Sequence, residues 1–187
     1  MFIGSVDAAL EGLLRARLPL PEDIGDVTFD PPTGSWSSQL SRLTVSLFLY
    51  DVQRSNQPSR SQVRQVDADG SAIRRRPQPM MQLSYLVSAW AGSPRDEHQL
   101  LGDVTSVLAG VEALPAEHLP DSLSSSVHLS LGDERTLPRE VWTSVGGTLK
   151  AATCLRATVG ADTFDWETEA PGVERIAAMA SRMDESS

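Results

Sequence analysis

Apolar residues near the start of the chain recur at steps of three and four positions. This spacing gathers them on one face of an α-helix, and Pro19 and Pro21 end the pattern. The same spacing returns from Asp96 onward and predicts a second amphipathic helix. The apolar positions are Ile3, Val6, Leu10, Leu13, Leu14 and Leu18 in the first helix, and Leu100, Leu101, Val104, Val107, Leu108 and Val111 in the second.

Two segments, 43–52 and 81–90, alternate in the manner of β-strands. The second segment is apolar on both faces, which is typical of a strand covered on both sides of its sheet. We therefore expect it to be central and buried, and to pair with the first segment as a long hairpin. Its apolar residues are Leu83, Tyr85 and Val87 on one face and Leu86 and Trp90 on the other.

Shorter patterns predict one more helix and three more strands. The helix begins at Pro138 and ends at Gly146 and Gly147, where proline and glycine suit the first turn and the C-terminus. The strands are expected at 27–29, 127–131 and 149–159. Helices and strands in this order predict an α+β fold: a mixed, mostly antiparallel sheet with two to three packed helices.

Two regions lack these patterns. Residues 53–80 are polar and rich in turn residues, so we predict a long loop that is either functional or disordered. From Gly160 onward acidic residues outnumber basic ones. The predicted organisation is therefore one domain over residues 1–160 and an acidic C-terminal arm over residues 161–187.

The chain has 187 residues and a formal net charge of −9, so it is long enough for one domain with a core and poorly suited to binding nucleic acid. It contains one cysteine and therefore cannot form an intramolecular disulfide. The N-terminus lacks the features of a signal peptide, and no apolar run approaches the ~20 residues of a membrane span. We expect a soluble cytoplasmic protein.

Catalytic and metal-binding motifs are absent from the sequence. His98 and His128 are interpreted as polar residues of a helix start and a strand face, and Cys154 as a buried structural thiol. We therefore predict no catalytic residue, no metal site and no cofactor. A small enzyme with an unrecognised site around His98 or His128 remains an open alternative.

Six arginines are concentrated in and beside the predicted loop, where only Asp67 and Asp69 oppose them, a net charge of +4. They are interpreted as a solvated surface, a weak nucleic-acid patch without aromatic residues for stacking, or a docking surface for an acidic neighbour. The acidic tail of another copy, or a partner subunit, could be that neighbour. The candidate partner-binding residues are Arg54, Arg60, Arg64, Arg74, Arg75 and Arg76.

Several motifs occur in the order found in a known family. They are FDPP (29–32), LFLYDV (47–52), RPQPMMQLSYLVSAW (76–90), EHQLLG (97–102) and Val141-Trp142. Together they cover about residues 3–160. In these motifs the chain resembles the sheath-and-tube terminator, or cap, proteins of extracellular contractile injection systems, in their N-terminal domain.

The resemblance implies a structural protein without catalysis that ends the sheath and inner tube of a phage-tail-like particle. It also implies a fold like that of phage tail terminators and a homo-hexameric ring that contacts sheath and inner-tube subunits. The particle would be assembled in the cytoplasm. The alternative that the residues leave open is a non-catalytic adaptor whose arginine-rich loop holds an acidic peptide or partner.

Overall fold

The computed structural model describes residues 2–38, 40–59, 62–121, 123, 125–132 and 137–169. The chain forms two compact units. The first contains Met1–Arg60 and Gln78–Thr163, and the second contains Ser61–Pro77 and Phe164–Ser187. Among the described residues, no helix is both long enough and apolar enough to cross a membrane.

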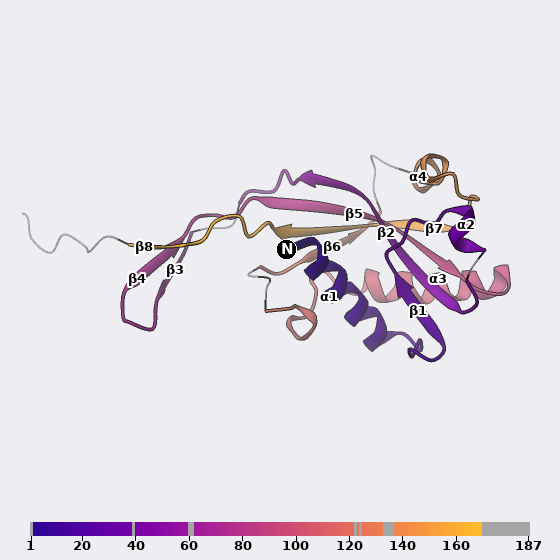
Figure 1. Ribbon diagram of the computed structural model, residues 1–187, viewed down its shortest axis with the longest axis horizontal. Helices are drawn as coiled ribbons and strands as arrows, with labels where there is room; N and C mark the ends of the chain where they lie inside the picture. The colour runs from indigo at the N-terminus through magenta and orange to yellow at the C-terminus, as the bar shows by residue number, and fades with distance from the viewer. Residues whose placement is uncertain are drawn as a thin grey trace, which may run out of the picture. The chain divides into compact units, whose positions relative to one another are not determined.

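A five-stranded sheet forms the centre of the first unit (Figure 1). Its strands lie in the order β1-β2-β5-β7-β6. β1 is parallel to β2, and the other neighbours are antiparallel. The strands are β1 (Gly25–Thr28), β2 (Leu43–Arg54), β5 (Met80–Trp90), β6 (His128–Leu131) and β7 (Ala152–Gly160).

β5 is the middle strand, as its two apolar faces predicted. It pairs with β2 on one side, where Leu47 lies opposite Val87, and with β7 on the other, where Cys154 lies opposite Leu86. Both ladders satisfy its backbone, so a strand with no exposed face can be buried without orphaned polar groups. The predicted pairing of 43–52 with 81–90 is confirmed.

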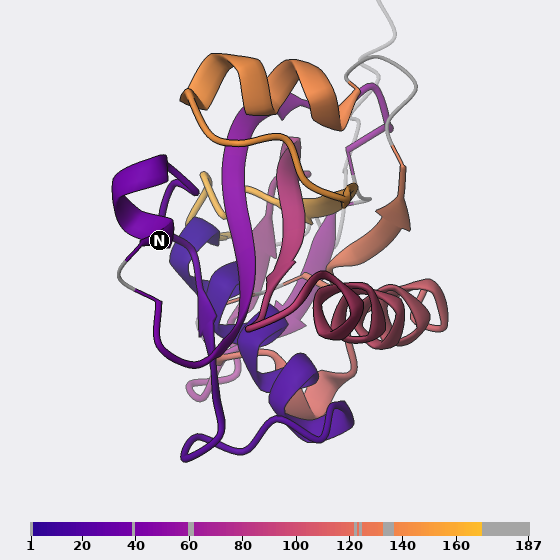
Figure 2. The same ribbon diagram turned by 90° about the vertical axis from the view of Figure 1, so that its right-hand side faces the viewer.

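Helices α1 (Phe2–Arg17) and α3 (Pro94–Ala109) cover one face of this sheet (Figure 2). The side chain of Ser93 caps α3 by accepting a hydrogen bond from the Asp96 backbone N–H, which places the helix start two residues before the predicted one. The core on this face includes Val6, Leu10, Leu13 and Leu14 of α1, Val104 and Leu108 of α3, and Leu83, Tyr85 and Val87 of β5.

The opposite face carries α4 (Pro138–Val145) and the short α2 (Gly34–Ser37) (Figure 2). The sequence pattern predicted α4 but not α2. α4 ends at Gly146, whose φ of 67° is the left-handed conformation expected of a C-terminal glycine. Trp90 packs edge-on against Trp36 and Trp142, with ring centroids 5.3 and 6.1 Å apart. A 3₁₀ turn, η1 (Ala116–His118), lies in the connection after α3.

Part of the predicted loop and the first residues of the predicted arm form strands in the second unit, whereas residues 170–187 of the arm lie outside the described residues. Strands β3 (Val63–Val66) and β4 (Ala72–Arg75) form a hairpin, and β8 (Trp166–Thr168) pairs with β4 to complete a three-stranded sheet (Figure 1). The hairpin turn is built on Asp67, whose carboxylate accepts hydrogen bonds from the backbone N–H groups of Asp69 and Ser71.

This grouping differs from the predicted division at residue 160. The hairpin belongs with residues that follow Thr163, because β4 pairs with β8. Sequence periodicity missed it because four-residue strands without a buried face give no clear alternation. The predicted α+β fold with a mixed, mostly antiparallel sheet is nevertheless confirmed.

Candidate interaction surfaces

The residues considered for chemistry lie on separate elements. His98 is exposed on α3, His118 is half-buried in η1, and His128 is exposed on β6. Cys154 is buried in β7. Within the described ranges, no group of three His, Cys, Asp or Glu side chains is arranged to hold a metal ion. His98 near a helix start, His128 on a strand and Cys154 buried in a strand lie where the sequence placed them.

One titratable pair joins α1 to the central strand. The Tyr85 hydroxyl donates a hydrogen bond of 2.7 Å to the Asp7 carboxylate. Burial raises the pKa of Asp7, although the hydrogen bond from Tyr85 acts in the opposite direction. Burial and the neighbouring carboxylate raise the pKa of Tyr85, which keeps its proton. The pair therefore fixes the helix on the sheet and supplies no accessible acid or base.

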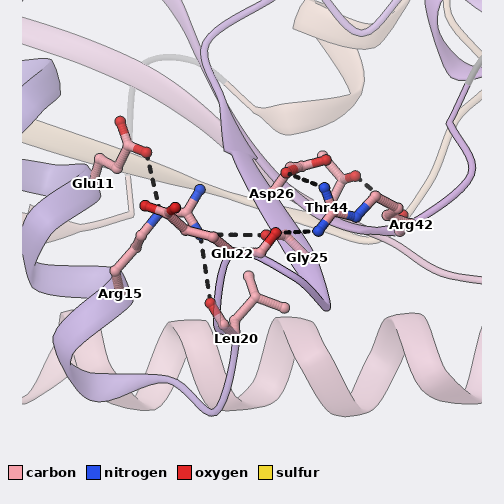
Figure 3. A network of polar contacts seen from close by, with 8 residues as sticks. All are labelled: Glu11, Arg15, Leu20, Glu22, Gly25, Asp26, Arg42 and Thr44. Carbon is pink, nitrogen blue, oxygen red and sulfur yellow. Dashed lines mark hydrogen bonds and ion pairs between the residues drawn. The ribbon is translucent and has the colours of Figure 1, made fainter.

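Two arginines hold the edge strand β1 in place through hydrogen bonds and ion pairs (Figure 3). Arg15 of α1 pairs with Glu11 at 3.1 Å and donates to the backbone oxygen of Gly25 at 3.2 Å. Arg42 pairs with Asp26 at 3.3 Å and also contacts the backbone oxygen of Glu22. These contacts hold β1 and the turn before it against α1 and β2.

The only lysine of the chain, Lys150, lies at an open cavity of about 620 Å³ in the first unit. Its ammonium group contacts the Glu97 carboxylate and lies 4.1 Å from the centroid of the Trp90 ring. Arg42 and Asp23 also line the cavity, so charges of both signs surround it. The sequence pattern did not predict this cluster of Lys150, Glu97 and Trp90. The only feature that set Lys150 apart in the sequence was that every other basic residue is an arginine.

The predicted partner-binding arginines are divided between the units. Arg54 ends β2, and Arg60 lies outside the described residues. The other four belong to the hairpin and the residue that follows it. The structure pairs three of them with the acidic segment of the same chain: Arg64 with Glu169 at 2.9 Å, Arg74 with Glu167 at 3.7 Å, and Arg76 with Glu167 at 2.5 Å.

Arg75 contacts the same segment through its backbone and an aromatic ring. Its Nε donates to the Phe164 backbone oxygen at 2.6 Å, and its guanidinium carbon lies 5.9 Å from the Trp166 ring centroid. The described start of the acidic tail, residues 164–169, thus contacts these arginines within the chain. Because these ion pairs are largely exposed, each contributes about 0–1 kcal/mol to the free energy of unfolding. They fix the positions of surface side chains and add little to the stability of the fold.

Comparison with known proteins adds to this geometry. The Pvc16 N-terminal domain family matches residues 5–175. No curated protein matches the sequence. Solved structures that share the fold include the sheath/tube terminator of the extracellular contractile injection system PVC in its extended state and the tube-terminating cap of the anti-feeding prophage AFP.

The terminator aligns with a TM-score of 0.60 and 21% identity, over 99% of this chain and 64% of its own. The cap aligns with a TM-score of 0.65 and 18% identity, over 94% of this chain and 60% of its own. This chain therefore spans less than two thirds of the length of either protein. At such identities the likeness concerns the fold.

Proposed function

We propose that this chain, which belongs to the Pvc16 N-terminal domain family, is a structural cap that ends the sheath and inner tube of a contractile injection system. The family match over residues 5–175 carries the proposal. The fold shared with a sheath/tube terminator and a tube-terminating cap supports it. The family resemblance seen in the sequence motifs is thereby confirmed.

A terminator acts through surfaces. Its copies close into a ring, for which we propose six, and one end of that ring fits the last sheath and tube subunits. Polymer growth then stops because the next subunit finds no matching end. No catalysis is required for this role.

The adaptor alternative, in which the arginines hold an acidic peptide, has less support. Glu167 and Glu169 already pair with Arg64, Arg74 and Arg76. An incoming peptide would have to displace these carboxylates.

Deleting the gene tests the cap directly. Electron microscopy of particles from the deletion strain should show irregular lengths, or frayed ends distal to the baseplate, and the wild-type gene should restore uniform particles. Particles of normal length and yield in the deletion strain would overturn the proposal. Light scattering of the purified chain should show a species of roughly six copies.

A further inference from the structure

The two sheets treat their edges differently. In the first unit, residues 112–114 run along the outer side of β6, where the Leu129 N–H donates to the Glu112 backbone oxygen at 2.9 Å. The other edge strand, β1, is held by Arg15 and Arg42. In the second unit, β3 and β8 each pair only with β4 among the described residues. Within the described part of the chain, both edges of the three-stranded sheet are therefore open.

These open edges are complementary in charge. β3 carries Arg64, and the carboxylate of Asp67 after it is engaged in the hairpin turn. β8 and its flanking residues carry Asp165, Glu167 and Glu169. Side chains of the two edges can form an ion pair, since Arg64 contacts Glu169 at 2.9 Å within one chain. Opposite charges on neighbouring strands stabilise a pairing, and like charges oppose it.

Both edges also expose apolar side chains on the same face of the sheet. Val63 and Trp166 lie in one row, on either side of Arg75, and are 46% and 39% exposed. No described residue of this sheet is buried. A three-stranded sheet without a buried face is marginal by itself, so additional strands would stabilise it.

The strand directions define how copies could join. β3 and β8 are both antiparallel to β4, and are therefore parallel to each other. When copies follow one another head to tail, β8 of one copy meets β3 of the next in parallel, and the faces of the two sheets stay aligned. Such a contact uses two different surfaces, and it closes into a ring when the rotation allows.

We propose that β8 of one copy pairs with β3 of the next, so that the three-stranded sheets join neighbouring copies of this chain. In this junction Arg64 exchanges Glu169 of its own chain for Glu167 and Glu169 of the neighbour, one carboxylate contact for another. Val63 then lies beside the neighbour's Trp166. The inference rests on the proposed cap, because a cap needs a closed ring. It adds which surfaces join the copies.

Charge reversal on separate chains tests the junction. Arg64→Glu alone and Glu169→Arg alone should each lose the multimer in light scattering, because like charges then meet at every junction. Mixing the two variants should restore it, since a ring in which they alternate has the original ion pair at one junction and the reversed pair at the next. Mixing cannot repair the pair inside each chain, so restored assembly reports contact between copies.

Cysteine cross-linking supplies a second measurement. Gln65 and Thr168 both lie opposite Ile73 on different sides of β4, about 10 Å apart, so cysteines there cannot join within one chain. The variant Gln65→Cys, Thr168→Cys, with Cys154→Ala, should give a ladder of covalent multimers under oxidised glutathione. Each single-cysteine variant should give dimers at most.

The outcomes separate this inference from the cap itself. Single charge variants that assemble like wild type, a mixture that stays dissociated, or a wild-type chain that remains monomeric at high concentration overturns the junction. Circular dichroism and melting of each variant confirm that the first unit is folded. If one of these results is found while the deletion strain makes uncapped particles, the chain is still a cap, and its copies contact one another through other surfaces.

Discussion

β5 and β4 are both middle strands, yet they differ in everything that stabilises a fold. β5 has apolar side chains on both faces, and Leu83, Tyr85, Leu86 and Val87 are fully buried. β4 has no buried residue, and its neighbours are held by exposed ion pairs. A middle position in a sheet therefore does not make a core. The five-stranded sheet provides the fold, and the three-stranded sheet provides a surface.

The largest effect should follow from placing a carboxylate at the centre of β5. Leu86→Asp buries a charge among Trp90, Val141 and Trp142, at a cost of several kcal/mol. We expect no soluble folded protein. The matched change in β4, Ile73→Asp, should leave the melting temperature near that of wild type. Equal loss of folded protein in both variants would mean that the two sheets are one cooperative core.

The same contrast explains what the sequence could predict. The long apolar patterns of α1, α3, β2 and β5 identified the main elements, because burial on a defined face leaves a period in the sequence. β3, β4 and β8 left no period, because their residues face solvent. Their pairing depends on contacts distant in the chain, such as that of Arg76 with Glu167. The arginines were found by charge and the acidic tail was named as a possible neighbour, but which carboxylate pairs with which arginine could not be predicted.

Two tryptophans sharpen the comparison at smaller scale. Trp142 is 1% exposed and anchors α4 on the sheet, so Trp142→Ala should cost about 3–5 kcal/mol in the free energy of unfolding. Trp166 is 39% exposed, and Trp166→Ala should cost well under that. Urea unfolding followed by circular dichroism measures both. A larger loss for Trp166 would contradict the division into core and surface.

The Asp7–Tyr85 pair tests a polar contact at the edge of the core. Tyr85→Phe leaves the half-buried carboxylate without its donor and should cost about 1–3 kcal/mol at neutral pH. Asp7→Asn keeps an oxygen acceptor for the Tyr85 hydroxyl but carries no charge. It should be more stable than wild type at neutral pH.

That gain should depend on pH. Burial raises the pKa of Asp7 in the folded protein above that of the unfolded chain. The contribution of the protonated Asp7 side chain to stability is therefore fully present below the pKa of the unfolded carboxyl, and it is lost as the pH rises through the pKa of the folded protein. The difference between Asp7→Asn and wild type should therefore shrink as the pH is lowered toward about 4. Urea unfolding between about pH 4 and 8 measures it. A difference that does not change with pH would show that Asp7 is effectively solvated.

The smallest effect on stability should come from the arginine face of the second unit. Replacing Arg74, Arg75 and Arg76 together by Ser should change the main unfolding transition by no more than ~0.5 kcal/mol per site, because surface substitutions rarely cost more. The sheet itself should loosen, since Glu167 loses both of its guanidinium partners. Trypsin should then cut after Arg64 faster than in wild type, and Glu167→Gln should give the same acceleration with the arginines intact.

If the arginines also contact a neighbouring ring, particles from the triple variant will be irregular in length, like those of the deletion strain. Uniform particles would instead identify this face as solvated and leave the β3 and β8 edges as the functional part of the sheet.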